Sequence, residues 1–406
     1  MAAQLQLSRN THVYASDGTN FWELPVLDGF SFSQSTATTE VSVSEMADLT
    51  GVSRRGRRMF TDAFEPAEWN LQMYARPFTA SSLGNHTDEV LWANFVNAGT
   101  YTSGTRIWAD PITNLNHITK ATNTSTIDFN NTNVSALGTF ALYFVLGACG
   151  TAPASYSAGP GQPQTIYRIS GAVCNTVTMD FDIDGILTLD WSGLGSLLEE
   201  IPAMPNNWHS AIIADGIPHS TNNFIRNRLT TLAVTIGNTD QDSDTTTGDA
   251  DGDGGASTLG DEFMANYALT LTGGSITFEN NLTYLTPEEL CVVNQPLGNV
   301  TGNRSVSGSF TCYLNSGTSA NTATTGTSAD LFDDLASAVN VVTNSMDLVF
   351  SIGGATSPKL VIDIPTAHLE IPTHQIEDVI GLEVNFHALP SSLDATNEAT
   401  IAYHAV

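Results

Sequence analysis

Positive charge is scarce in this sequence. The 406 residues include 42 Asp and Glu but only 13 Lys and Arg, so the formal net charge is −29 at pH 7. Only two of the basic residues are lysines, Lys120 and Lys359. A surface with this charge repels phosphate groups, which argues against a nucleic-acid ligand and against an anionic membrane as a partner.

Long hydrophobic runs and closely spaced cysteines are also missing. The longest apolar stretch, "FALYFVLGA" at Phe140 to Ala148, is too short to span a bilayer. No signal-peptide pattern follows Met1, so we expect neither secretion by the usual route nor membrane insertion. The cysteines lack the CxxC spacing of zinc and redox sites, which predicts buried free thiols at Cys149, Cys174, Cys291 and Cys312.

Local signatures of catalysis are absent too. The sequence contains no HExxH, no GxSxG, no P-loop and no GxGxxG after a strand. The nine histidines are scattered, and His368, His374 and His387 form the closest set. On strands such histidines are more often surface residues than metal ligands. We therefore expect no enzyme activity and no cofactor.

The sequence is rich in strand patterns. Apolar and polar residues alternate in "GFSFSQS", "SITFEN", "GILTLDWSG" and "IGLEVNFHA", with Gly, Asn and Pro between the runs. Only two stretches predict helices, "TDEVLWANFVNAG" from Thr87 and "SADLFDDLASAVNVV" from Ser328. Each begins with a Thr or Ser cap and acid in the first turn. The chain is therefore predicted to be mainly β.

The predicted elements recur in the same order in both halves. The two helices superpose at a spacing of 240 residues, with Leu91 on Leu331 and Phe95 on Leu335. Strand patterns before and after them also match, including Phe32 with Phe278. Five matches in series predict an internal duplication. We expect homologous domains at 1–200 and 224–406, a linker at 201–223, and insertions at about 100–139 and 239–262.

The second insertion is an acidic stretch, Thr239 to Glu262, with eight carboxylates and no Lys or Arg. Asp249, Asp251 and Asp253 begin it like a calcium-binding loop, but the twelfth position is Gly260 instead of the Glu that closes the ligand shell. The first half has only the short turn "SDGT" at this place. The stretch is interpreted as an enlarged, solvated hairpin turn, with calcium binding as the weaker alternative.

A second group of acids follows a strand pattern. In "MDFDIDG", Met179, Phe181 and Ile183 alternate with Asp180, Asp182 and Asp184. Alternation places the acids on one face of a sheet. The same rule puts Asp190 on the polar face of the next strand and Glu383 on the corresponding face of the second half. An ordinary solvated face is the alternative to a functional one.

The basic residues are concentrated in one segment, "SRRGRR". It holds four of the thirteen Lys and Arg, at Arg54, Arg55, Arg57 and Arg58. No aromatic residues are interleaved as they are in single-strand nucleic-acid sites. A contact with an acidic surface on another copy of the chain fits the segment better.

Several of these strings resemble the major tail tube proteins of long-tailed bacteriophages. The resemblance is closest in "SITFENNLTYLTPEEL", "GNRSVSGSFTCYL", "SADLFDDLASAV" and "PTAHLEIPTHQIEDVIGLEVNFHAL", and the first half carries the same succession more loosely. It implies two tail-tube-type β-sandwich domains, each flanked by one α-helix. It also implies a virion protein that assembles into stacked rings, forming the tail tube that conducts DNA during genome ejection.

The resemblance assigns roles to the singled-out residues. Two domains per chain imply trimeric rings with pseudo-six-fold symmetry. The loop at about 45–62, with its four arginines, is expected to contact the next ring, and a shorter counterpart lies at 290–303. The acids Asp180, Asp182, Asp190 and Glu383 are expected to face a lumen through which DNA passes without specific binding. Expected partners are the tape measure, tail terminator and tail-tip or baseplate proteins, with assembly in the host cytoplasm.

Two other functions compete with this interpretation. The acidic stretch and the Thr- and Asn-rich strands also suit a calcium-stabilised β-sandwich adhesin or surface-layer protein, although no signal peptide supports it. A β-sandwich hydrolase would need a pocket with converging carboxylates. Assembly into rings or tubes distinguishes the tail tube interpretation from both.

Overall fold

The fold is described from a computed structural model of the chain. The structure describes residues 6–42, 57–78, 84–129, 136–147, 164–205, 223–236, 266–290, 292–317, 325–336, 345–376, 378–393 and 395–405. Within these ranges the protein is mainly β, with two α-helices, as the alternating patterns predict. The helices are α1 (Glu89–Phe95) and α2 (Ser328–Ala336).

The strands divide between the two halves of the chain. The first half contains β1 (His12–Ser16), β2 (Phe21–Leu24), β3 (Ser31–Ser33), β4 (Thr36–Ser42), β5 (Arg57–Phe64), β6 (Ala67–Tyr74), β7 (Thr100–Thr102), β8 (Ile107–Ala109), β9 (Asn116–Ala121), β10 (Thr124–Asp128), β11 (Phe140–Leu146), β12 (Thr165–Asp182), β13 (Thr188–Gly195) and β14 (Leu197–Glu200). The second contains β15 (Thr231–Ile236), β16 (Asn266–Tyr267), β17 (Leu271–Glu279), β18 (Thr283–Leu285), β19 (Gly298–Val300), β20 (Ser305–Tyr313), β21 (Thr325–Gly326), β22 (Met346–Ile352), β23 (Lys359–Leu369), β24 (Thr373–Gln375), β25 (Gly381–Ala388) and β26 (Thr400–His404).

Strand pairing follows the same series in each half. In the first half, β2, β1, β11 and β12 are neighbours, and β12 continues through β13 and β6 to β3. In the second half, β16, β15, β22 and β23 are neighbours, and β23 continues through β25 and β20 to β17. The long strands β12 and β23 therefore each pass from one group of strands to the other.

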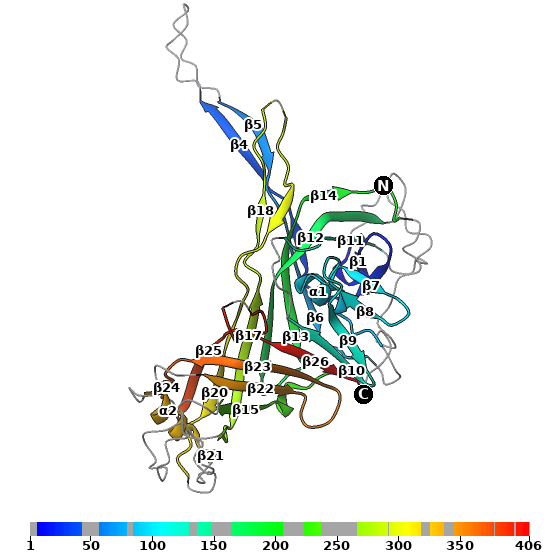
Figure 1. Ribbon diagram of the computed structural model, residues 1–406. Coiled ribbons are helices and arrows are strands. Elements are labelled where there is room, and N and C mark those ends of the chain that lie inside the picture. Colours follow the sequence, from blue (N-terminus) through cyan, green and yellow to red (C-terminus); the bar gives the residue numbers. More distant parts are fainter. Residues whose placement is uncertain are drawn as a thin grey trace, which may run out of the picture.

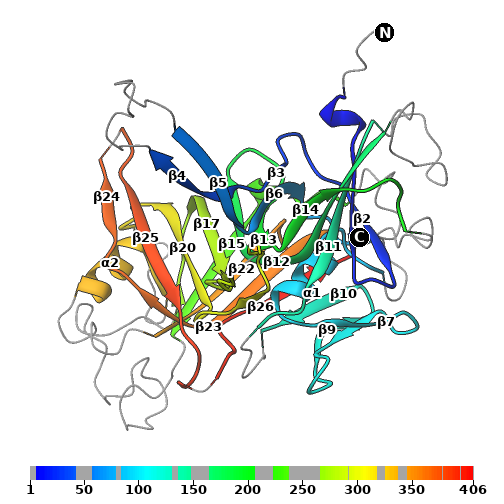
Figure 2. The ribbon, with the colours of Figure 1, turned by 90° about the horizontal axis from the view of Figure 1, so that it is seen from above.

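One sheet runs through both halves. The C-terminal part of β12 pairs with β17 along Thr176 to Asp182, with Val177 opposite Phe278. This junction gives the strand order β3, β6, β13, β12, β17, β20 and β25 (Figures 1 and 2). Backbone pairing thus fixes how the halves sit against each other.

The first insertion makes a second junction between the halves. Strands β7, β8, β9 and β10 pair in order, and β10 then pairs with β26 near the C-terminus. Strands β7 to β10, which lie in the segment predicted as an insertion, therefore extend the sheet of the second half, and their residues Trp108, Ile118 and Ile127 are buried.

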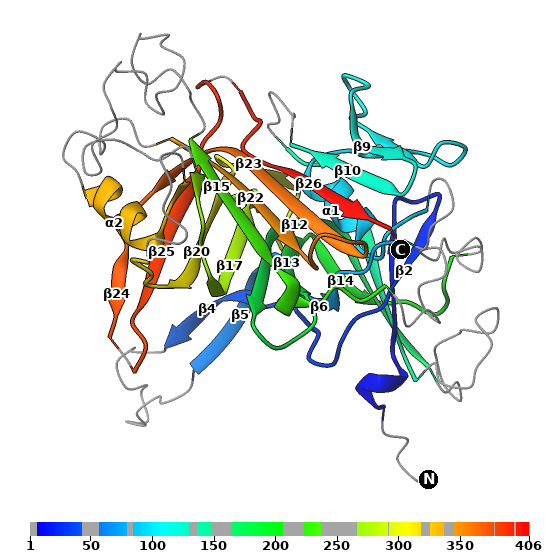
Figure 3. The ribbon, with the colours of Figure 1, turned by 90° about the horizontal axis from the view of Figure 1, so that it is seen from below.

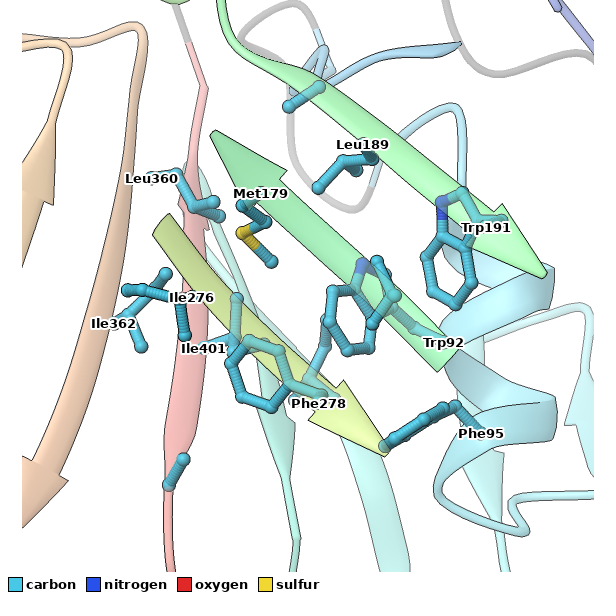
Figure 4. Packing of buried hydrophobic residues seen from close by; sticks show 14 of the residues in the cluster. Trp92, Phe95, Met179, Leu189, Trp191, Ile276, Phe278, Leu360, Ile362 and Ile401 are labelled. Carbon is cyan, nitrogen blue, oxygen red and sulfur yellow. The ribbon is translucent and has the colours of Figure 1, made fainter. Parts of the chain in front are cut away.

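The core continues across the two halves. Figure 4 shows Trp92 and Phe95 of α1 packed among Trp191 of β13, Met179 of β12 and Phe278 of β17. The ring of Trp92 lies 4.8 Å from that of Trp191 and 5.6 Å from that of Phe278, both edge-on. Such contacts add about 0.5–1.5 kcal/mol per pair beyond the burial of apolar area. The helix predicted from its apolar stripe therefore sits over the junction between the halves.

The predicted helix caps need correction. The Thr87 hydroxyl donates to Tyr74 O at 3.4 Å and does not cap α1. In α2 the capping residue is Thr327 and not Ser328, because Thr327 N donates to the Asp330 carboxylate at 2.7 Å while Thr327 Oγ1 accepts from Asp330 N at 3.4 Å. This reciprocal pair is a capping box that begins one residue before the predicted position.

Candidate functional site

The sheet that joins the halves has one apolar and one polar face. Side chains at alternate positions of β6, β12, β13, β17, β20 and β25 are buried, and those between them are more open. On the polar face Asp180 lies opposite Thr188 and Ser275, and Ser309 lies opposite Asn385. The predicted alternation is therefore confirmed, and it forms one surface shared by both halves.

The predicted acids lie on this polar face. Asp180 and Asp182 end β12, Asp190 lies in β13 and Glu383 lies in β25. Burial raises the pKa of Asp180, and the nearby charges of Asp190 and Asp182 raise it further. Ile183 departs from the predicted pattern, because β12 ends at Asp182 and Ile183 is exposed in the following turn.

Hydroxyl groups cover another part of the polar face, beside amides such as Asn70 and Asn385. Thr178 and Thr277 are hydrogen-bonded across the junction of the halves at 3.2 Å, and Thr272 and Thr311 are hydrogen-bonded at 2.7 Å. The only Lys or Arg in these six strands is Arg168, which lies in the N-terminal part of β12, away from the junction with β17, and is paired with Glu199 of β14. The surface is therefore acidic and polar without a cation that would hold a phosphate.

Two hairpin arms project from one end of the sheet and stand side by side (Figure 1). The first arm is β4 with β5, and the second is β18 with β19. They are joined at Asn294, whose N donates to Asp62 O at 3.0 Å and whose O accepts from Phe64 N at 2.8 Å.

The basic segment belongs to the first arm. Arg57 and Arg58 are exposed and begin β5, so residues 57–62 of the predicted loop are strand. The Arg57 guanidinium lies 3.6 Å from the Glu40 carboxylate, and that of Arg58 lies 5.8 Å from the Phe60 ring centre. Arg54 and Arg55 lie outside the described residues.

Comparison with known proteins gives this geometry a context. Residues 13–388 match the family model described as phage tail tube protein. The chain belongs to the phage tail tube protein family. It is also 27% identical over 414 residues to "Tail tube protein pb6" of Escherichia phage T5, which covers 98% of this chain and 76% of that relative.

Membership of the tail tube family settles the class of function. The tail tube protein is a structural, non-enzymatic component of the virion tail, and it self-assembles into the tube. This membership excludes the hydrolase interpretation and replaces the adhesin or surface-layer alternative.

The sites predicted for metal and thiol chemistry are only partly described. Asp249, Asp251 and Asp253 fall outside the described ranges, although the flanking strands β15 and β16 pair as a hairpin. No cluster of three or more His, Cys, Asp or Glu that could hold a metal occurs among the residues the structure covers. In the same ranges no helix is long and apolar enough to cross a membrane. Cys174 and Cys312 are buried free thiols as predicted, and burial raises the pKa of Cys312 to about 11.

The tail tube protein also contains a buried polar network that the sequence patterns do not reveal. Asp88, with no exposed side-chain area, accepts from Trp92 Nε1 at 2.8 Å and from the Tyr403 hydroxyl of β26. Glu89 accepts from Trp108 Nε1 at 2.9 Å and is paired with Lys120 of β9. One of the two lysines is therefore internal, and the network ties α1 to the insertion and the C-terminal strand.

A second buried contact holds the C-terminal segment. Arg304 Nη2 lies 2.5 Å from the Glu398 carboxylate and donates to Phe129 O and Thr396 O, each at 2.8 Å. Its guanidinium also lies over the Phe129 ring, 4.8 Å from the ring centre. The residues that contact Arg304 are distant from it in the sequence, and no sequence motif predicts these contacts.

Proposed function

We propose that the protein is a duplicated tail tube subunit, three copies of which close into a ring of six similar domains. The repeated pairing series supports a duplication at 1–200 and 224–406, and β11 and β22 are seven-residue strands 206 positions apart. In each half one long strand, β12 or β23, passes from one group of strands to the other. This arrangement fits one β-sandwich domain with one helix in each half. Around the ring, the junctions between domains would then lie alternately within one chain and between two chains. The ring would keep closed symmetry with three subunits instead of six.

The observation that carries this proposal is the β12–β17 junction. The counterparts of β17 and β12 are β3 and the segment from His368 to Gln375. Among the described pairings β3 pairs with β6 alone, and this segment pairs on one side, with β25. The sheet thus ends in two open edges that can pair between neighbouring chains, as β12 and β17 do within one chain.

Side-chain exposure agrees with an unfilled edge. Met179, two residues after Val177, is fully buried at the junction within the chain. On the edge segment the register against β25 shifts by one residue between Leu369 and Thr373, and Ile371 at this shift is 52% exposed. Electron microscopy of the purified protein tests ring formation: rings and stacked tubes are expected, and a monodisperse monomer under all assembly conditions would contradict the proposal.

We place the polar face with Asp180, Asp182, Asp190 and Glu383 towards the lumen. An acidic surface without Lys or Arg lets DNA pass without binding. Cysteine introduced as Asp190→Cys, with Cys149 and Cys291 changed to Ser, is expected to react in tubes with small thiol reagents and not with bulky ones. Asp28→Cys, at an exposed loop position, is the control. Equal reaction of Asp190→Cys with both reagents in intact tubes would place this face outside.

We further propose that Arg54, Arg55, Arg57 and Arg58 contact carboxylates of the adjacent ring. Since exposed ion pairs are screened by salt, ring stacking should weaken as ionic strength rises. Replacing all four with Glu is expected to leave rings and abolish tubes, measured by sedimentation and microscopy. If that variant forms tubes like the parent at low salt, the contact does not depend on these charges.

The remaining proposals follow from this role. The ends of the tube would meet a tail terminator and a tail-tip or baseplate protein, and the lumen would hold a tape measure protein before DNA passes. Assembly would take place in the host cytoplasm. None of these partners requires a cofactor or a membrane contact from this chain.

A further inference from the structure

Two histidines flank the ladder that joins strands β7 to β10 to the C-terminal strand. Strand β10 pairs with β9 on one side and with β26 on the other, and Figure 3 shows β9 and β10 beside β26. His404 of β26 lies opposite Thr124 at one end of β10. His117 of β9 adjoins Ile118, which lies opposite Ile127 near the other end. One imidazole therefore lies at each end of the second junction between the halves.

His117 is turned into the fold by an irregularity in β9. Strand β8 pairs Trp108 with Ile118 and Ala109 with Asn116, so His117 is the extra residue of a β-bulge. Bulges redirect side chains and are common at functional positions. His117 is 1% exposed, and neither ring nitrogen makes a hydrogen bond of ordinary geometry to the described residues. Burial of this kind disfavours the charged form of an imidazole.

The charged groups around His117 do not offset its burial. Burial is the largest influence and lowers the pKa of His117. The carboxylates of Asp110 and Asp128 and the nearby Asp128 backbone favour the imidazolium, whereas the charge of Arg304 opposes it. The Asp110 carboxylate also accepts from Ile112 N at 2.6 Å and from Thr113 N at 2.8 Å. The loop after β8 therefore uses part of the hydrogen-bonding capacity of this carboxylate.

His404 has a similar environment at the other end of β10. Burial, followed by the charge of Lys359 in β23, lowers the pKa of His404. Its Nδ1 lies 3.4 Å from the Thr124 hydroxyl, a contact between β26 and β10. Separation of β10 from β26 would hydrate both rings and return their pKa values to about 6.5, the ordinary value for histidine.

We propose that the β9–β10–β26 junction is an acid-released latch, closed while His117 and His404 are neutral and opened when these rings take up protons. The latch acts within one chain and does not depend on the proposed ring. Because the closed junction binds these protons less tightly than the open one, its stability is fully present above about pH 6.5 and is lost as the pH falls below that value. Opening uncovers Ile127 and Tyr403, which are fully buried, and frees one edge of β26.

Asp128 acts in the opposite direction at lower pH. Burial raises the pKa of Asp128, so the closed junction takes up a proton at this carboxyl before the open junction does. This uptake stabilises the closed junction as the pH approaches the ordinary carboxyl range, near about 4. The effect of the two histidines should therefore be measured between about pH 7.5 and about pH 5.5, above that range.

Hydrogen exchange of the full-length protein over this pH range tests the latch. Below about pH 6.5, the protection of β10 and β26 amides, corrected for intrinsic exchange rates, is expected to fall by up to about tenfold per pH unit for each histidine. Amides of the β12–β17 junction should keep their protection and serve as the internal reference. His117→Gln and His404→Gln should each reduce the pH dependence, and the double variant should remove it. His374→Gln, at an exposed position of β24, is the matched control and should behave like the parent.

A double variant that is as pH-dependent as the parent would overturn the latch. Parallel loss of protection at the β12–β17 junction would also overturn it, because the histidines would then act on the whole fold. If the glutamine variants do not fold, NMR titration of the parent decides the question. The latch predicts that at least two of the nine histidine rings are still neutral at about pH 6. Fewer than two such rings would contradict it.

Discussion

Replacing Ile371 with aspartate is expected to stop ring closure and leave a folded monomer. Ile371 is half-exposed on the edge segment that pairs with β25 alone, while Met179 is fully buried where β12 meets β17 within the chain. A carboxylate there would have to be buried without a partner when β3 of the next chain pairs with this edge, which costs several kcal/mol. Size-exclusion chromatography with light scattering should show the loss of rings.

The matched control for this variant is Ile112→Asp. Ile112 is 84% exposed on the insertion, so the same change of side chain occurs away from the sheet edges. Surface substitutions of this kind usually change the free energy of unfolding by less than about 0.5 kcal/mol. Rings of Ile371→Asp as abundant as those of the control would show that this edge does not close the ring.

Replacing Asp88 with alanine is expected to lower the free energy of unfolding by about 3–5 kcal/mol, the range seen when one member of a buried polar or charged group is removed. The change leaves Trp92 Nε1 and His86 without their carboxylate partner. Burial, followed by the Asp88 charge, raises the pKa of Tyr403, so its hydroxyl stays protonated and donates to Asp88. Urea unfolding should therefore show a lower midpoint.

Two comparisons isolate the cause of that loss. Asp88→Asn keeps one acceptor oxygen and is expected to fall between the alanine variant and the parent. Glu200→Ala, at an exposed position of β14, removes a carboxylate with no buried partner and should change little. If Asp88→Ala were as stable as Glu200→Ala, the network would contribute nothing measurable to holding β26 on α1.

Much of the fold follows from local patterns. Period-two alternation predicts the polar face, because Met179 and Phe181 must turn inward if Asp180 and Asp182 are to stay hydrated. The apolar stripe with Trp92 and Phe95 predicts the buried face of the helix. These features depend on neighbours in the chain, so a single sequence is enough to find them.

The features that decide assembly depend on distant residues. The alternation in β12 does not predict that Val177 lies opposite Phe278. The sequence "ITKATNTSTIDF" likewise does not predict that β10 pairs with β26. The arms were predicted as loops, because charged and exposed residues such as Arg57 and Arg58 lack a buried face that would mark a strand. The network around Asp88 is likewise set by tertiary packing, which brings Tyr403 to a helix 311 residues away at Trp92.

The mass of isolated rings, measured by native mass spectrometry, tests the central claim most directly. A ring of six similar domains built from duplicated chains contains three copies of the 43.1 kDa subunit. Three chains per ring are therefore predicted. Six chains per ring would contradict the account, because one half of each chain would then stand outside the wall of the tube.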